Sequence, residues 1–151
     1  MSRGSSHISV DAKGRVSIPT KHRHALTTET GTDLVVTISA TDRCLLLYTA
    51  EDWVSVEAKL VALPQLNPQI RKLKRMLIGH ADDVSMDASG RVLLPSALRE
   101  FAGIEKKAVL VGQGDKFEVW DEAQWVAERD SMYDVELDEA NLPEELAALA
   151  F

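Results

Sequence analysis

An internal repeat constrains the fold of this chain more than any other feature of its sequence. Residues 11–23 match residues 87–99 at a fixed offset of 76, and seven of the thirteen positions are identical. The match continues at the same offset, where residues 34–35 align with residues 110–111. Self-similarity at a fixed period is typical of a duplicated structural unit, so the sequence predicts a tandem duplication.

Beyond these positions four residues drop out of the second copy, and the match resumes at an offset of 72. Tyr48 then aligns with Trp120, and Trp53 aligns with Trp125. The predicted division, in chain order, is repeat one at 5–62, a connecting helix at 63–80, repeat two at 81–134 and an acidic C-terminal tail at 135–151. A copy of fewer than about 60 residues buries little core by itself. We therefore expect the two copies to complete each other as a β-rich unit with pseudo-twofold symmetry.

Each copy begins with two short strands joined by a tight turn. Residues 8–10 and 16–18 alternate apolar and polar side chains, which is typical of half-buried strands. The Asp-Ala-Lys-Gly segment between them supplies an aspartate that can bond the turn backbone and a glycine that tolerates positive φ. A proline ends the second strand in each copy and suits the first position of a helix.

The remaining elements follow from the same patterning. Short helices are predicted at Thr20–Leu26 and Ser96–Ala102, the second of them capped by Gly103. Strand pairs follow at Asp33–Ile38 with Cys44–Tyr48 and at Ala108–Gly112 with Phe117–Trp120. Each copy then has a helix, which begins at Trp53 in the first and at Trp125 in the second. Two sets of side chains should face the core from the last two helices: Val54, Leu60 and Val61, and Trp125, Val126, Met132 and Tyr133. Tyr48, Trp53, Trp120 and Trp125 are expected in the core or at a subunit interface.

The segment between the copies has the pattern of a capped helix. Asn67 is a good N-cap, Pro68 suits the first helical position and Gly79 suits the C-terminal cap. An apolar stripe is accompanied by four basic residues: Arg71, Lys72, Lys74 and Arg75. These basic residues form either a solvated helix face between the repeats or a phosphate-binding surface.

The formal net charge of −7 would normally argue against nucleic acid as a partner. The charge is unevenly distributed, however. Residues 1–125 hold 16 basic and 16 acidic residues, whereas residues 126–151 hold one basic and eight acidic residues. The first 25 residues carry five basic residues and one acid, so a basic patch lies at the N-terminal end of a chain whose acidity resides in its tail. We hypothesise that the tail discourages non-specific DNA binding by repulsion.

Several function classes have no support in the sequence. We expect no membrane span, because no apolar run approaches the roughly 18 residues that one requires. The N-terminal segment lacks the apolar core of a signal peptide. Cys44 is expected to be a small buried residue in a reducing cytoplasm. The four histidines are scattered, and His22 and His24 are expected to be solvated, with an approach to DNA phosphates as the alternative. The sequence shows no catalytic triad and no phosphate-cradling loop. We therefore expect no enzyme, no catalytic residue, no metal site, no cofactor and no small-molecule substrate.

The strand, Asp-x-x-Gly-Arg turn, strand, proline and helix of each copy resemble the swapped-hairpin DNA-binding domain of the AbrB/SpoVT class. The duplication of this unit in a chain of this length resembles the MraZ family. Other segments that resemble the family are Arg3-Gly4, residues 44–48, 77–81, 110–113 and 116–121, and Trp125. The resemblance covers about residues 1–130. It implies an α+β fold in which two tandem AbrB-type β-barrel repeats with swapped hairpins form an intrachain pseudo-dimer flanked by amphipathic helices.

The resemblance also implies a function. MraZ proteins are bacterial transcriptional regulators, typically repressors, that act at the promoter of the division and cell-wall gene cluster. They associate with the nucleoid and assemble as ring-shaped homo-oligomers that bind a series of short repeated DNA boxes. The expected partners are therefore double-stranded DNA and further copies of the chain. The family's two Asp-x-x-x-Arg motifs correspond to Asp11 with Arg15 and to Asp87 with Arg91.

These motifs suit a β-ribbon that enters the major groove of DNA. Arg15 has the forked guanidinium that bonds guanine O6 and N7 together, whereas Lys13 suits a phosphate. The full set of expected DNA-binding residues is Arg15, Lys13, Arg3, Arg91, Lys21 and Arg23. The expected turn-forming residues are Asp11, Gly14, Asp87 and Gly90. Asp11 with Arg15 is alternatively a turn-stabilising ion pair without DNA contact.

The second copy is a weaker DNA-binding candidate because Ser89 replaces Lys13. Arg91 contacts DNA, or else it serves the fold or a subunit contact. A rival interpretation makes the chain an AbrB-type antitoxin, or another protein-interaction module, whose acidic tail binds a basic partner.

Overall fold

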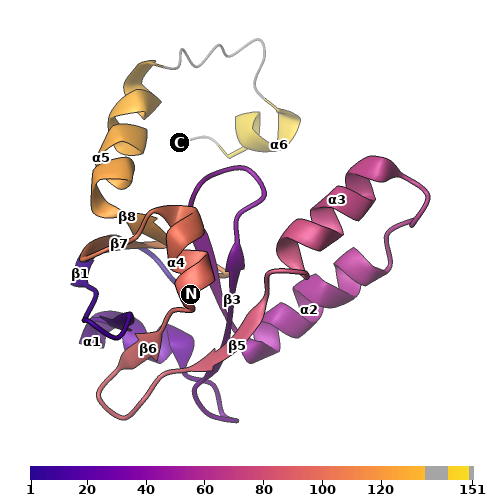
Figure 1. The fold of residues 1–151 in the computed structure, drawn as a ribbon. Helices are drawn as coiled ribbons and strands as arrows, with labels where there is room; N and C mark the ends of the chain where they lie inside the picture. The colour runs from indigo at the N-terminus through magenta and orange to yellow at the C-terminus, as the bar shows by residue number, and fades with distance from the viewer. Residues whose placement is uncertain (135–142, 150–151) are drawn as a thin grey trace.

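The computed structural model describes residues 1–134 and 143–149. The strands are β1 Ser5–Ser9, β2 Arg15–Ser17, β3 Asp33–Ile38, β4 Leu45–Thr49, β5 Asp82–Ser85, β6 Arg91–Leu93, β7 Lys107–Gly112 and β8 Phe117–Asp121. The α-helices are α1 Thr20–Arg23, α2 Ala50–Val61, α3 Pro68–Leu77, α4 Ser96–Ala102, α5 Glu122–Ser131 and α6 Glu144–Ala147; two 3-10 turns cover His24–Leu26 and Met132–Asp134. The mixed α+β content of the prediction is confirmed (Figure 1).

The strands of the two copies are interleaved in one antiparallel sheet. Its six strands run in the order β1-β7-β8-β4-β3-β5, so each copy's first strand pairs with the other copy's third. The order reads the same when the copies are exchanged, which is the expected pseudo-twofold symmetry. The remaining strands, β2 and β6, pair with each other across the copies as a separate two-stranded ribbon. Each copy therefore supplies strands that the other needs.

No sheet in the described part of the chain is closed into a barrel. The six-stranded sheet ends in two edge strands, β1 and β5, and the β2–β6 ribbon is attached to it only by single bridges at Val10–Val16 and Met86–Val92. One bridge at each edge does not make a continuous ladder, so the ribbon and the six-stranded sheet remain separate sheets. The expectation of β-barrel repeats is therefore not met.

The pairing also corrects the alignment of the third strands. Leu34 lies opposite Thr49 in the first copy, and Ala108 lies opposite Asp121 in the second, so Leu34 is equivalent to Ala108 and not to Leu110. Two residues drop out before the strand and two more in the turn that follows it. A shift of two residues returns every side chain to the same face of a strand, so the apolar pattern could not reveal the error.

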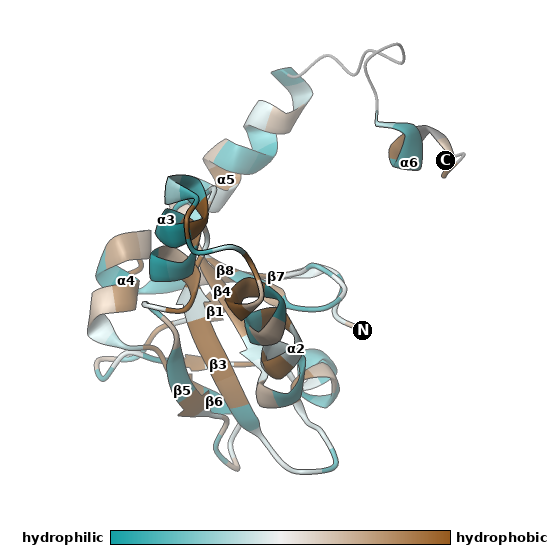
Figure 2. Ribbon diagram, turned by 90° about the vertical axis from the view of Figure 1, so that its right-hand side faces the viewer, coloured by the Kyte–Doolittle hydropathy of each residue, from teal (hydrophilic) through white to brown (hydrophobic). Residues whose placement is uncertain are grey.

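One face of the sheet packs on the ribbon and the two short helices to form a shared core. Val16 and Val92, the inward residues of the ribbon, are fully buried there as counterparts from the two copies. Counterparts Ile18 and Leu94 follow them and are also fully buried. Figure 2 shows the strongly apolar β3 running through the sheet. Burial of this kind is the main stabilising contribution in folding, and here neither copy makes it alone.

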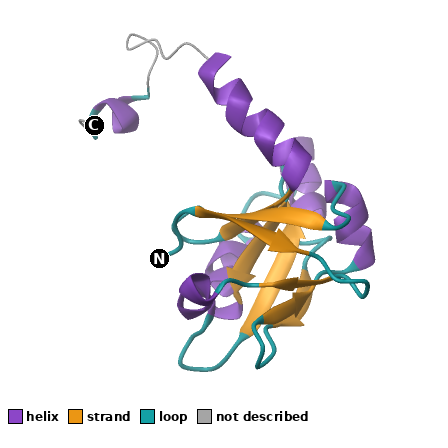
Figure 3. Cartoon of the chain, turned by 90° about the vertical axis from the view of Figure 1, so that its left-hand side faces the viewer, coloured by secondary structure: helices purple, strands orange, loops and turns teal. Residues whose placement is uncertain are grey.

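The opposite face of the sheet carries two smaller clusters, one for each copy. Under α2 and α3, Tyr48 packs on Trp53 with ring centroids 5.4 Å apart; under α5, Trp120 packs on Trp125 at 5.8 Å. Figures 1 and 3 show these helices outside the sheet, with α5 projecting away from it. Tyr48, Trp53 and Trp120 are buried as predicted, and Trp125 is half-buried.

Four other side chains of these helices were predicted to face the core, but the structure exposes them. Val54 and Val61 are 67% and 61% exposed, and Met132 and Tyr133 are also exposed. Both helices begin three residues earlier than expected, because Thr49 and Asp121 cap them by accepting from the backbone N–H groups of Asp52 and Gln124. In α2 the buried residues Trp53 and Leu60 lie seven positions apart and share the face that meets the sheet, whereas Val54 and Val61 lie one position further round the helix.

The helix ends elsewhere follow the predicted caps. The Asn67 side chain accepts a hydrogen bond from the Gln69 backbone N–H at 2.9 Å, and Pro68 is the first residue of α3. Gly103 ends α4 in the left-handed conformation at φ 67°. The helix α3 ends at Leu77 and is capped by Ile78, one residue before the predicted Gly79.

The expected acidic tail at 135–151 lies largely outside the described residues, which include only positions 143–149 of it. Among the described residues, no helix is long and apolar enough to cross a membrane.

Candidate nucleic-acid interface

The turn at residues 11–15 is built around the carboxylate of Asp11. Its Oδ1 accepts hydrogen bonds from the backbone N–H groups of Lys13 and Arg15, both at 2.9 Å. Its Oδ2 accepts from the Arg15 Nε at 2.7 Å. Gly14 adopts φ +89°, a left-handed conformation that disfavours other residues. Asp11 therefore shapes the turn and holds the Arg15 side chain at the same time.

The second copy repeats this geometry. Asp87 accepts from the backbone N–H groups of Ser89 and Arg91 at 2.9 and 2.8 Å, and from the Arg91 Nε at 2.9 Å. Gly90 takes φ +78°. The alternative role of a turn-stabilising ion pair is thus part of the geometry in both copies. It leaves the terminal guanidinium nitrogens of Arg15 and Arg91 with no hydrogen-bond partner among the residues that the structure describes.

Hydrogen bonds lower the pKa of both aspartates. The backbone N–H of Arg15, followed by its side chain and the N–H of Lys13, lowers the pKa of Asp11 to about 2 against the opposing effect of burial. The pKa of Asp87 is lowered in the same way, first by the backbone N–H of Arg91. A carboxylate that stays charged at neutral pH holds its arginine through a charge-assisted bond.

The β2–β6 ribbon places both arginines on one face. Arg15 lies opposite Leu93, and Ser17 lies opposite Arg91, while Val16 and Val92 point into the core. Because side chains alternate along a strand, Arg15, Ser17, Arg91 and Leu93 share the outer face of the ribbon. The arginines therefore occupy diagonal positions on one surface, with the two turns at opposite ends of the ribbon.

Each turn is supported by an arginine from the other copy. A Cβ on Gly14 would lie 2.5 Å from Cζ of Arg99, so the guanidinium of Arg99 rests on that turn. The Arg99 Nε also donates to the Leu94 carbonyl at 3.0 Å, and the Leu94 N–H donates to the Gly14 carbonyl at 3.1 Å. The turn of the first copy is thus fixed from the second.

The reciprocal contact changes the position expected for Arg23. Its guanidinium rests on Gly90, and its Nε donates to the Ile18 carbonyl at 2.9 Å. Arg23 is half-buried and lies at the second turn, although the sequence places it in the basic segment of the first. Arg99 was not among the expected site residues, although its match to Arg23 at the offset of 76 indicates the equivalent role.

The other expected contacts are dispersed. Lys13 is exposed within the first turn, and Lys21 is exposed on α1. Arg3 lies beside Gly112 at the far end of β1, so the five residues of that strand, at about 3.3 Å each, separate it from the turn. The structure therefore brings Lys13 and Arg15 together and places Arg3 elsewhere.

His22 is buried, so its expected solvent exposure is wrong. Its Nε2 lies 2.9 Å from the Ser6 hydroxyl, and its ring packs edge-on against Phe117 with centroids 5.2 Å apart. Burial, followed by the charge of Lys21, lowers the pKa of His22. The equivalent residue in the second copy is the buried Leu98, so this buried position holds a polar side chain in the first copy and an apolar one in the second. His24 is exposed as expected.

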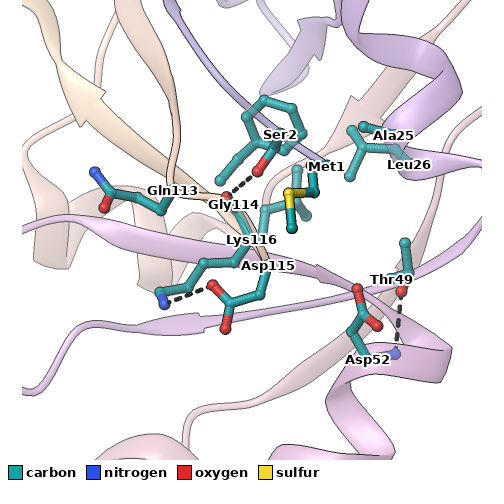
Figure 4. A pocket seen from close by; sticks show the side chains of 12 residues that line it. Met1, Ser2, Ala25, Leu26, Thr49, Asp52, Gln113, Gly114, Asp115 and Lys116 are labelled. Carbon is teal, nitrogen blue, oxygen red and sulfur yellow. Dashed lines mark hydrogen bonds and ion pairs between the residues drawn. The ribbon is translucent and has the colours of Figure 1, made fainter. Parts of the chain in front are cut away.

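A pocket of about 390 Å³ lies between the N-terminus and the β7–β8 turn (Figure 4). Its polar contacts are structural: Ser2 Oγ donates to the Lys116 carbonyl, Lys116 pairs with Asp115 at 3.1 Å and Thr49 caps α2. Among the described residues, no three His, Cys, Asp or Glu side chains are grouped to hold a metal ion. Burial raises the pKa of Cys44 to about 12, consistent with the small buried residue expected.

The family model described as "MraZ protein, putative antitoxin-like" matches residues 1–76 and again residues 77–143. The chain belongs to the MraZ family. Its relatives include proteins named Transcriptional regulator MraZ from Halorhodospira halophila, 46% identical over 99% of both chains, and from Legionella pneumophila, 49% identical over 97% of both. A protein of the same name from Shewanella amazonensis is 50% identical over 89% of both chains. The MraZ family is a family of regulators, which confirms the prediction that the chain is not an enzyme.

Proposed function

We propose that the chain is a DNA-binding transcriptional regulator that reads sequence through the first turn and the β2–β6 ribbon. One observation carries the proposal: Asp11 holds Arg15 by its Nε, so that the other end of the guanidinium has no partner among the described residues. The printed names of the MraZ relatives support the same class of function.

The geometry suits recognition in the major groove. A two-stranded ribbon fits the groove, and an arginine fork bonds guanine O6 and N7 in one plane. Lys13, exposed in the same turn, is placed for a phosphate, which fixes position without reading sequence. Arg91 is the equivalent reader on the second half of the ribbon. Arg3, Lys21 and Arg23 remain proposed phosphate contacts away from the first turn, with Arg3 beside Gly112, Lys21 on α1 and Arg23 at the second turn.

The finer assignments follow family membership. We infer that the protein is cytoplasmic, associates with the nucleoid and acts, as a repressor, at the promoter of the division and cell-wall gene cluster. A ring-shaped homo-oligomer engaging several short repeated boxes gains affinity by avidity, which offsets the small footprint of each copy. The interleaved copies support an AbrB-type swapped-hairpin assignment for the fold, and the divisions at 62, 80 and 134 remain our proposed boundaries.

Binding to the DNA upstream of the chain's own gene tests the proposal. We expect Arg15→Ala to weaken binding to that duplex by about 1–3 kcal/mol, or roughly 5- to 150-fold. Mobility shift against a random duplex of equal length should show a smaller loss, because base contacts carry the preference. Arg129→Ala is the matched control, since Arg129 is exposed and pairs with Asp130 at 3.4 Å on α5. Full affinity in a folded Arg15→Ala protein would contradict the assignment.

The antitoxin interpretation is a second candidate, because the description of the matched family model includes that class. It places the acidic tail, most of which lies outside the described residues, against a basic protein. Stoichiometric co-purification of a small basic protein, together with unchanged DNA affinity in Arg15→Ala, would favour it over DNA recognition.

A further inference from the structure

The exchange of strands between the copies gives each turn a neighbour from the opposite half of the chain. The Val10 N–H, next to the first turn, donates to the Lys106 carbonyl at 2.9 Å. Ser9 lies directly opposite Lys107 in the β1–β7 pair. The side chains of Lys106 and Lys107 are both exposed. Two lysines that are more than 90 residues away in sequence therefore lie beside Asp11.

The second turn has a different neighbour at the equivalent place. The Met86 N–H donates to the Thr32 carbonyl at 3.1 Å, and Ser85 lies opposite Asp33. Thr32 and Asp33 are thus the structural counterparts of Lys106 and Lys107. The pseudo-twofold symmetry of the backbone is retained while the charge is changed from basic to acidic.

The charge gathered around the first turn differs from the charge around the second. Seven positions at the first turn have counterparts at the second, and at the first turn they hold five basic and two acidic residues: Lys13, Arg15, Arg99, Lys106 and Lys107, with Asp11 and Glu105. The equivalent positions at the second turn hold two basic and two acidic residues: Arg91 and Arg23, with Asp87 and Asp33. The basic surface at the first turn is therefore assembled from both copies, and only two of its five cations precede residue 90.

We propose that Lys106 and Lys107 extend the DNA-binding surface of the first turn as phosphate contacts. This inference rests on the proposed function and adds to it a pair of residues from the other copy. Lysine ammonium groups are point charges suited to phosphate and not to base reading, so these residues contribute affinity and orientation but not sequence preference. Their place next to the turn matches that role, because phosphates flank the groove that a ribbon enters.

Salt dependence of binding tests this inference. The variant Lys106→Gln/Lys107→Gln removes two charges from exposed side chains and keeps the backbone pairing. Each lost phosphate contact makes the slope of log Kobs against log salt shallower by about 0.9, so we expect a change of about 2 between 50 and 200 mM salt. Affinity at 50 mM salt should fall roughly tenfold or more, and equally for the upstream duplex and for a random duplex.

Lys59→Ala/Arg129→Ala is the control that removes the same charge from exposed positions on α2 and α5. A slope in the lysine variant equal to that of the control, with a melting temperature like the wild type, would overturn the inference while leaving the proposed function standing. A changed oligomeric state with an unchanged slope would assign the lysines to a subunit contact and would also overturn it. Failure of the wild-type protein to bind either duplex would overturn both the inference and the proposed function.

Discussion

Two arginines of this chain support the turn of the copy to which they do not belong. Arg99 rests on Gly14 and Arg23 rests on Gly90, so each glycine is needed both for its positive φ and for the room it leaves. The aspartate and glycine of each turn were predictable, because a tight turn demands those residue types. The arginines that support the turns were not, because no local pattern records a contact across the molecule.

His22 gives the fold a dependence on pH. Burial lowers its pKa, so the unfolded chain takes up a proton at a pH where the folded protein does not. This contribution to the free energy of unfolding is complete above about pH 6.5, the usual histidine value, and falls as the pH drops from there through the lower folded pKa. The variant His22→Leu, which copies the buried Leu98 of the second copy, should lose that part of the pH dependence.

Urea unfolding at pH 7.5 and pH 5.5 measures the effect. The wild type should lose more stability between the two values than His22→Leu does, with His24→Leu, at an exposed position, as the control. Equal losses in the wild type and in His22→Leu would show that the His22 ring is not the group responsible.

At the level of elements, alternation and capping predicted much of the secondary structure. The strand Asp33–Ile38 and the helix Ser96–Ala102 have the predicted bounds, because a run of mainly apolar, β-branched residues marks the first and Pro95 and Gly103 delimit the second. The helix predicted at Thr20–Leu26 appears as α1 followed by a 3-10 turn. The unrecognised cap at Thr49 explains why α2 starts earlier than expected, and its core-facing side is the one that Trp53 shares with Leu60.

Adjacent residues of α2 should therefore respond very differently to truncation. Trp53 is 5% exposed, packs on Tyr48 and donates from its indole Nε1 to Glu57 at 2.8 Å, whereas Val54 is 67% exposed. We expect Trp53→Ala to lower the free energy of unfolding by about 3–5 kcal/mol. Val54→Ala should change it by less than about 0.5 kcal/mol. Chemical denaturation followed by circular dichroism compares the two; similar losses would mean that the helix presents another face.

Across the whole molecule, the sequence revealed the duplication but not how the copies interlock. The pattern of a strand shows which face is buried but not which strand lies beside it, so the β1–β7 and β3–β5 pairs had to come from the structure. For the same reason the charge around each turn could not be assigned by position in the chain. The site's turn residues were predictable from local motifs, and its cross-copy neighbours were not.

The shared core predicts that the copies unfold together. In the variant Trp53→Phe the remaining tryptophans report on the second copy, and in Trp120→Phe/Trp125→Phe the remaining tryptophan reports on the first. Within each variant, the urea midpoint by fluorescence should coincide with the midpoint by far-ultraviolet circular dichroism, as for a single cooperative unit. Separate midpoints in either variant would mean that the copies are independent domains.

Because the two turns have neighbours of different charge, the two ends of the ribbon are not equivalent toward a DNA duplex. A homodimer built from one unmodified copy would present identical turns and would approach a duplex equally well either way round. In this chain, Lys106 and Lys107 stand where the other turn has Thr32 and Asp33. Covalent duplication allowed the two ends of one ribbon to diverge, so the protein is polarised in charge along the ribbon even though its backbone remains almost symmetric.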